Sequence, residues 1–152
     1  MNDLSSDSLP RAAAWLGYGG LLPFVGLVLL IRLDPHHGLV WGDALVAYGA
    51  VILSFVGALH WGFAMALPDL TAEQRRACFI WSTVPALIAW PAILLMPPLA
   101  SALLVAGFVA HYWQDRRLAV QTTLPRWYLP LRLRLTIVAS VCLLAGAFFA
   151  VF

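Results

Sequence analysis

Five long apolar runs constrain the fold of this chain more than any other feature of its sequence. They cover residues 12–31, 44–67, 77–96, 99–114 and 131–152, which is most of the 152 residues. A run of about 20 apolar residues is long enough to cross the hydrocarbon core of a bilayer as a helix. Only 11% of the residues are charged, against roughly 25% in soluble domains. The sequence therefore predicts an all-α, polytopic membrane protein, with a five-helix transmembrane bundle as the single domain of residues 1–152.

The arginines predict how this bundle is oriented. All nine basic residues are arginines, and with five spans eight of them fall on the side of the amino terminus, while Arg32 falls on the other. Basic residues are enriched in cytoplasmic loops, so we expect the amino terminus inside and the carboxyl terminus outside. The first ten residues would form a short cytoplasmic tail. The positive charge is thus a signal of topology, and it does not indicate nucleic-acid binding.

Small residues in the second run predict a packing ridge. They recur every four residues, at Ala50, Ser54, Ala58, Gly62 and Ala66. A small-xxx-small pattern lets a neighbouring helix approach closely, and here the neighbour could belong to the same chain or to a second one.

Prolines and polar residues predict local features of the runs. Three prolines lie within them, at Pro23, Pro85 and Pro91. Each removes one helical hydrogen bond and frees the carbonyl four residues earlier. Ser82 and Thr83 are near enough to help satisfy the freed carbonyl of Trp81. Before the third run, Thr71 and Gln74 have the spacing of a capping box.

A histidine inside the second run, in the stretch ALHWGFAM, is the first candidate for a site. At 100° per residue His60 points away from the small-residue ridge, so it faces another helix or a gap between helices. Polar and aromatic residues of all five runs gather toward the inner side, where ionisable groups usually face the bundle interior. Residues 49–62 and 100–113 also align without gaps, which pairs His60 with His111. The candidate ligand-binding residues are His60, Trp61, Trp81, Ser82, Thr83, His111 and Arg132.

Two interpretations of this layer stay open. In the structural one, a neutral His60 ring donates to the freed carbonyl of Trp81, and His111 belongs to an aromatic belt in the stretch HYWQ. In the functional one, polar groups beneath an arginine rim bind an anionic or amphipathic ligand, such as a lipid headgroup, a quinone head or a haem propionate. Two histidines on different helices also suit a metal or haem iron. We predict no metal and no cofactor. If the layer does bind a cofactor, haem and quinone are the candidates.

The outer loop RLDPHHGLVWGD offers a second, weaker candidate. Asp34, His36, His37 and Asp43 are potential metal ligands, but the DP and HG pairs are typical of a solvated turn, which is the favoured interpretation.

Several observations argue against catalysis and transport. The sequence has no GxSxG, HExxH, CxxC or P-loop motif. No aspartate or glutamate lies within a predicted span, although proton-coupled transporters commonly have one there. The two cysteines, Cys78 and Cys142, are expected at different depths, so we predict no disulfide between them.

The stretch YGAVILSFVGALHWGFAM, with LLPFVGL before it and WSTVPALIAW and PRWYLPLRLRLTIV after it, resembles the transmembrane protein 69 family. Its most specific part is around Tyr48, Gly57, His60, Trp61 and Gly62. The family consists of small helical membrane proteins of proteobacteria with a mitochondrial relative, and its domain has no known function. The resemblance implies a multi-pass protein of the bacterial inner membrane, without an activity to carry over.

These observations together favour a non-enzymatic membrane protein. It would be an accessory or assembly partner of a larger membrane complex, or a binder of a small amphipathic molecule. The alternative is a small-solute transporter or channel that uses the His60 layer, and an enzyme has the least support. The lipid bilayer is the expected surrounding, and a second membrane protein is a possible partner.

Overall fold

The computed structural model describes residues 9–151, and these residues form six α-helices and one short 3₁₀ helix. The elements are α1 (Arg11–Gly19), α2 (Leu22–Leu33), η1 (Pro35–His37), α3 (Gly38–Ala66), α4 (Ala72–Ala92), α5 (Pro97–Gln121) and α6 (Tyr128–Val151). No strand occurs in this range, which confirms the all-α prediction. Most of the predicted cytoplasmic tail, residues 1–8, and the last residue of the fifth run lie outside the described residues.

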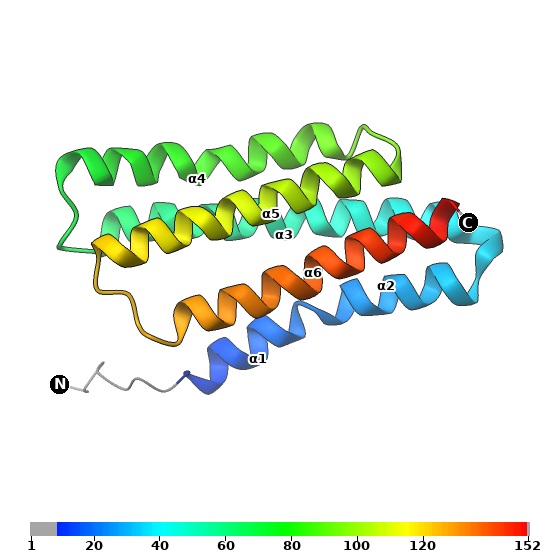
Figure 1. The fold of residues 1–152 in the computed structure, drawn as a ribbon, viewed down its shortest axis with the longest axis horizontal. Helices are drawn as coiled ribbons and strands as arrows, with labels where there is room; N and C mark the ends of the chain where they lie inside the picture. The colour runs from blue at the N-terminus through cyan, green and yellow to red at the C-terminus, as the bar shows by residue number, and fades with distance from the viewer. Residues whose placement is uncertain (1–8, 152) are drawn as a thin grey trace.

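The helices lie along the long axis of the molecule as an elongated bundle (Figure 1). α1 and α2 follow each other as one broken pass, and α3, α4, α5 and α6 then alternate in direction. α3 packs against α2 and α4, and α6 packs against α2 and α5. The start of α1 and the α3–α4 and α5–α6 connections share one end of the bundle, which we call the arginine end (Figure 1).

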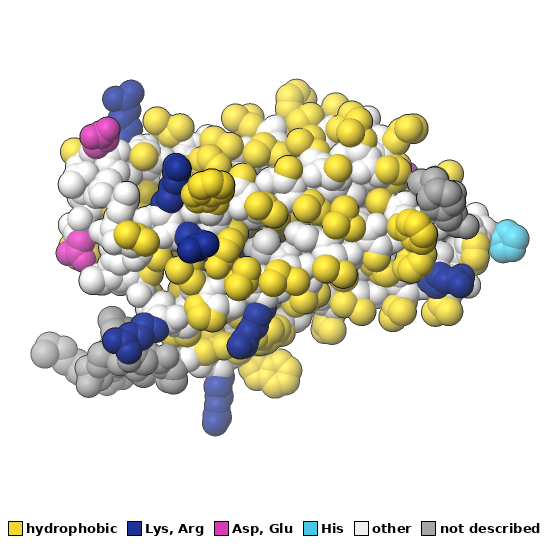
Figure 2. All heavy atoms as spheres, viewed as in Figure 1, with side chains coloured by type: hydrophobic (Ala, Val, Ile, Leu, Met, Phe, Trp, Pro, Cys, Tyr) yellow, Lys and Arg dark blue, Asp and Glu magenta, His cyan; other side chains and the backbone are white. Residues whose placement is uncertain are grey.

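The surface of the bundle is apolar between its two ends. Figure 2 shows hydrophobic side chains over the middle of the visible face, with most basic side chains toward the arginine end. Three helical stretches are long and apolar enough to cross a membrane: residues 11–33, 35–66 and 128–149. α4 and α5, which contain the third and fourth predicted runs, are not among them.

The first predicted run is two helices rather than one. α1 ends at Gly19, and Pro23 lies in the first turn of α2, where its missing N–H costs no helical hydrogen bond. The Tyr48 hydroxyl donates to the carbonyl of Gly20 at 2.9 Å and so satisfies one carbonyl at the break. Pro23 was expected to weaken a continuous helix, and it instead starts a new one.

Other helix ends also differ from the apolar runs. α5 continues to Gln121, well beyond the predicted end at residue 114, and α3 begins at Gly38 rather than at residue 44. The runs stopped at the first polar residues, but a helix continues through polar residues when they are paired or exposed at its end. The predicted Thr71–Gln74 capping box is confirmed, with the backbone N–H of Gln74 donating to the Thr71 hydroxyl.

The small-residue ridge of α3 is not a packing surface along its length. Ala58, Gly62 and Ala66 are exposed, and a Cβ placed on Gly62 would meet nothing within 4 Å. Ala50 is buried, so the ridge packs within the described chain at that end, and packing of the rest against a second chain stays a prediction. The side of α3 that carries His60 is the core side. On that side, a Cβ on Gly57 would lie 2.8 Å from the ring of Pro85, so Gly57 is what lets α3 and α4 approach closely.

Two apolar clusters make up the core. The larger one includes Leu53, Leu104 and Leu143 and fills the half of the bundle away from the arginine end. The smaller one, near the arginine end, consists of Ala64, Leu70, Cys78 and Leu118 with their neighbours. Cys78 and Cys142 are buried and free, as predicted.

Candidate functional site

A group of buried polar side chains lies between these two apolar clusters. His60 comes from α3, His111 and Asp115 from α5, and Tyr128 and Arg132 from α6, and each is at most 8% exposed. His111 and Asp115 are four residues apart, which places them on one face of α5. The rings of His60 and His111 meet edge to face, with centroids 4.9 Å apart. We call these five residues the polar cluster.

Asp115 is the centre of the polar cluster. The Arg132 Nε donates to its Oδ2 at 2.9 Å, and the Tyr128 hydroxyl donates to its Oδ1 at 3.2 Å. The Nε2 atoms of His60 and His111 each lie 3.7 Å from Oδ1, just beyond hydrogen-bond length. Both side chains are almost completely buried, so the Arg132 and Asp115 charges compensate each other, which is the condition under which buried charges are tolerated.

Trp81 of α4 determines which ring nitrogen of His111 carries the proton. Its indole N–H donates to the Nδ1 of His111 at 3.1 Å. An indole nitrogen only donates, so Nδ1 accepts and the His111 proton is on Nε2, the atom that faces Asp115. Neither ring nitrogen of His60 has a hydrogen-bond partner within the described chain. The hypothesis that His60 donates to the carbonyl of Trp81 is therefore wrong.

The potential metal-ligating atoms of His60, His111 and Asp115 lie within 4.8 Å of one another, close enough for these residues to share a metal ion. The hydrogen bond from Trp81 argues against this use. A metal-bound histidine almost always donates a hydrogen bond from the N–H of its second ring nitrogen, whereas Nδ1 of His111 accepts a hydrogen bond. This arrangement suits a hydrogen-bonded polar core better than a preassembled metal centre.

The outer loop forms a local pair instead of a metal site. The Nδ1 of His37 lies 2.9 Å from Oδ2 of Asp34, and the Trp41 indole N–H donates to the same oxygen at 3.2 Å. The hydrogen bond from Trp41, followed by that from His37, lowers the pKa of the Asp34 carboxyl below its ordinary value of 3.8. His36 and Asp43 do not join this pair in any metal-binding group of residues 9–151.

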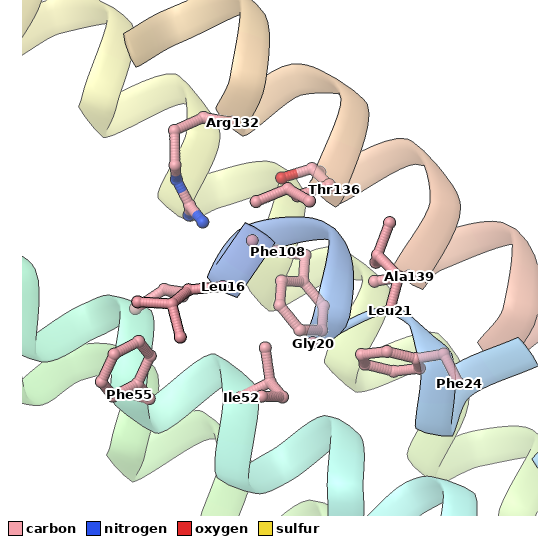
Figure 3. A pocket seen from close by; sticks show the side chains of 13 residues that line it. Leu16, Gly20, Leu21, Phe24, Ile52, Phe55, Phe108, Arg132, Thr136 and Ala139 are labelled. Carbon is pink, nitrogen blue, oxygen red and sulfur yellow. The ribbon is translucent and has the colours of Figure 1, made fainter. Parts of the chain in front are cut away.

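A cavity of about 100 Å³ lies beside the polar cluster, between the α1–α2 break, α3, α5 and α6 (Figure 3). Its floor is buried and includes Phe24 and Phe108, while Leu16 and Phe55 at its rim are exposed on the apolar surface. Figure 3 shows that the polar lining comes from α6, through Arg132 and Thr136.

The two polar side chains of the cavity both have unused hydrogen-bonding atoms. Nη2 of Arg132 and Oγ1 of Thr136 are buried without a hydrogen-bond partner among the described residues. Buried polar atoms are normally paired, so each such atom requires an explanation. Arg132 and Thr136 line the same cavity. The cavity therefore combines an apolar lining with unsatisfied hydrogen-bonding groups on its α6 side.

The structure brings only part of the predicted candidate set together. The members that meet are His60, His111, Arg132 and, through its hydrogen bond, Trp81. Ser82 is buried, but its hydroxyl donates to the carbonyl of Phe79. Thr83 is exposed and donates to the carbonyl of Ile80, so neither hydroxyl satisfies the carbonyl of Trp81 as predicted. Trp61 is 51% exposed and lies outside the polar cluster.

Asp115 and Tyr128 are absent from the predicted set. The fourth run was ended one residue before Asp115, so the statement that no acidic residue lies within a span missed a fully buried carboxylate in α5. The His111–Asp115 spacing of four residues on a helix was the signal available. The aromatic-belt interpretation is also wrong for His111, which is fully buried, whereas Trp113 is exposed as that interpretation predicts.

Comparisons with known proteins agree with the resemblance. A family described as a protein of unknown function (DUF3429) matches residues 9–148. Transmembrane protein 69 of Xenopus tropicalis is 38% identical over an alignment of 141 residues, which covers 90% of this chain and 54% of that protein. Transmembrane protein 69 of Mus musculus is 29% identical over 133 residues, 87% of this chain and 54% of that protein.

The chain thus spans about half the length of the curated relatives it matches. No solved structure matches it. With these relatives and its long apolar helices, the chain is a membrane protein of the DUF3429 family, to which the transmembrane protein 69 sequences are related.

Proposed function

We propose that this protein binds a small amphipathic molecule in the cavity beside Arg132, as a non-enzymatic protein of the bacterial inner membrane. In this proposal the chain crosses the bilayer five times, with α1 and α2 together as one crossing, the arginine end in the cytoplasm and the carboxyl terminus outside. The gathering of arginines at one end supports this orientation (Figure 2). The same pocket is compatible with an accessory role in a larger membrane complex.

The observation that carries the proposal is the pair of unpartnered polar atoms, Arg132 Nη2 and Thr136 Oγ1, in an otherwise apolar cavity. Ligand sites are typically apolar concavities with a few placed polar groups. An apolar cavity of about 150 Å³ is known to accept benzene, so about 100 Å³ suits one end of a ligand. The rest of an elongated molecule would pass the exposed rim at Leu16 and Phe55 into the lipid.

The other candidate functions fit this arrangement less well. Transport through the polar cluster requires a polar route to both sides, but the apolar clusters around Leu53 and around Leu118 lie on either side of it. A haem held by both histidines needs its ring plane between them, and the His60 and His111 rings are already in contact. Quinones stay within the amphipathic class that we propose.

Photoaffinity labelling tests the proposal. The protein in nanodiscs is labelled with a long-chain alcohol that carries a diazirine, and the labelled residues are mapped by mass spectrometry. We expect labels at the buried floor residues Phe24 and Phe108, with loss of these labels in Ala139→Leu, because Ala139 lines the cavity. The matched control is Ala106→Leu on the exposed face of α5, which should keep them. Equal labelling of the two variants would contradict a ligand site in this cavity.

A further inference from the structure

Resting on the proposed function, we infer that the cavity selects an uncharged carbonyl oxygen, as in a ketone, a quinone or an ester, over a carboxylate or another anion. The inference concerns the class of ligand. It follows from the charges and hydrogen-bonding atoms that surround Arg132.

The charge of Arg132 is already compensated. Its Nε donates to Oδ2 of Asp115 at 2.9 Å, and both side chains are almost completely buried. A ligand anion placed on Nη2 would leave one guanidinium facing two negative groups. A buried anion without its own counter-charge is strongly disfavoured. An uncharged ligand keeps the site neutral.

The cavity offers two hydrogen-bond donors, one of which, the Thr136 hydroxyl, can also accept. Nη2 of Arg132 can only donate, and the hydroxyl of Thr136 can donate as well. A carbonyl oxygen has two lone pairs and so can accept from both groups at once. A hydrocarbon would leave both donors unsatisfied, and an alcohol oxygen could accept from both but would bring an O–H donor of its own that also needs an acceptor.

The chain supplies a matched control for Thr136. Ser140 lies one turn further along α6, and its hydroxyl is also buried without a hydrogen-bond partner in the described part of the chain. Unlike Thr136, Ser140 does not line the cavity. Thr136→Val and Ser140→Ala therefore each remove one unpartnered hydroxyl, and both should raise the melting temperature of the ligand-free protein, since an unsatisfied buried hydroxyl is destabilising. Only Thr136→Val should change ligand binding.

Thermal unfolding with three probes of equal chain length tests the inference. The probes are methyl undecyl ketone, tridecanoate and tridecane, added to the protein in nanodiscs of ether-linked phosphocholine, which has no ester carbonyl. A ligand that binds only the folded protein raises its melting temperature. We expect the ketone to give the largest rise, with Thr136→Val weakening ketone binding about tenfold, as loss of one hydrogen bond predicts. Ser140→Ala should bind it as the natural sequence does.

The source of the carbonyl is tested by repeating the measurement without a probe in ester-linked nanodiscs. If lipid esters occupy the cavity, the natural sequence and Ser140→Ala should be stabilised there relative to ether-linked discs, and Thr136→Val less so. No such difference, with a response to the ketone in ether-linked discs, would indicate a free carbonyl compound.

The outcomes separate this inference from the proposed function. A rise with tridecanoate at least as large as with the ketone would overturn the selection of an uncharged carbonyl, while a binding site in the cavity would still stand. The same holds if Thr136→Val and Ser140→Ala bind the ketone equally well. If no probe shifts the melting temperature, ester-linked discs have no effect and photolabelling is unchanged in Ala139→Leu, the proposed function itself fails.

Discussion

The buried pair of Arg132 and Asp115 predicts strongly non-additive effects of substitution. Both side chains lie away from solvent, and Nε and Oδ2 are 2.9 Å apart. Arg132→Met leaves the Asp115 carboxylate without its counter-charge, and Asp115→Asn leaves the guanidinium without its own. Removing one partner of a buried ion pair costs about 3–5 kcal/mol of folding free energy, because an uncompensated buried charge is left behind.

The double variant Arg132→Met/Asp115→Asn removes both charges together. What it loses relative to the natural sequence is chiefly a charge-assisted hydrogen bond, so we expect a cost of about 1.5–3 kcal/mol. Independent effects would instead add to about 6–10 kcal/mol. The amide oxygen introduced by Asp115→Asn would still accept from the Tyr128 hydroxyl, as the carboxylate does now.

Reversible unfolding in mixed micelles, titrated with dodecyl sulfate and followed by circular dichroism, measures all four free energies of unfolding. Additive costs would refute the reasoning, as would single variants that each lose less than about 1 kcal/mol, the range of solvated ion pairs. Additive costs would mean that the two charges do not compensate each other, and small single costs would mean that water reaches the pair. The charge balance on which the selection of an uncharged ligand depends would then no longer hold.

Two further predictions concern the packing of α3 and the outer loop. Gly57→Ala should destabilise the fold by about 1–3 kcal/mol, because the added Cβ would lie 2.8 Å from the Pro85 ring. Gly62→Ala, with nothing within 4 Å, should be neutral or stabilising, and equal thermal shifts for the two variants would contradict this account. In the outer loop the pKa of Asp34 is lowered, so its contribution to stability is present above the ordinary value of 3.8 and is lost as the pH falls through the lowered pKa. The indole N–H resonance of Trp41 should therefore titrate with a midpoint below 3.8, and a midpoint above it would count against the hydrogen bond.

Sequence reasoning predicted the helical class and which residues share a side of α3 with His60, because both depend on residue periodicity. His60 was placed away from the small-residue ridge, and the structure places it on the core side with Leu53 and Val56. The neighbour of the ridge was left open between the same chain and a second one, and most of the ridge is exposed in the described chain. Small residues permit close packing on whichever side a partner lies, and periodicity alone cannot say which side faces the rest of the chain.

The polar cluster was predicted only in part, for a related reason. Hydropathy ends a run at the first charged residue, so Asp115 was left just outside the fourth run although α5 continues past it. A charge is tolerated inside a bundle when its partner arrives from another helix. Here the partner, Arg132, lies 17 residues away on α6. The tautomer of His111 likewise depends on the Trp81 indole, and no local pattern in the sequence predicts that contact.

In the proposed five-crossing topology, the length of α3 determines how deep its histidine lies in the bilayer. Its 29 residues rise about 43 Å, whereas the hydrocarbon layer is about 30 Å thick. Fitting the whole helix into that layer would require a tilt above 40°, beyond the range that membrane helices adopt. Both ends of α3 must therefore extend into the headgroup layers. Shared equally, that overhang puts His60 only about 3 Å inside the hydrocarbon boundary. This depth is close to that at which the acyl chains of phospholipids join their glycerol backbones.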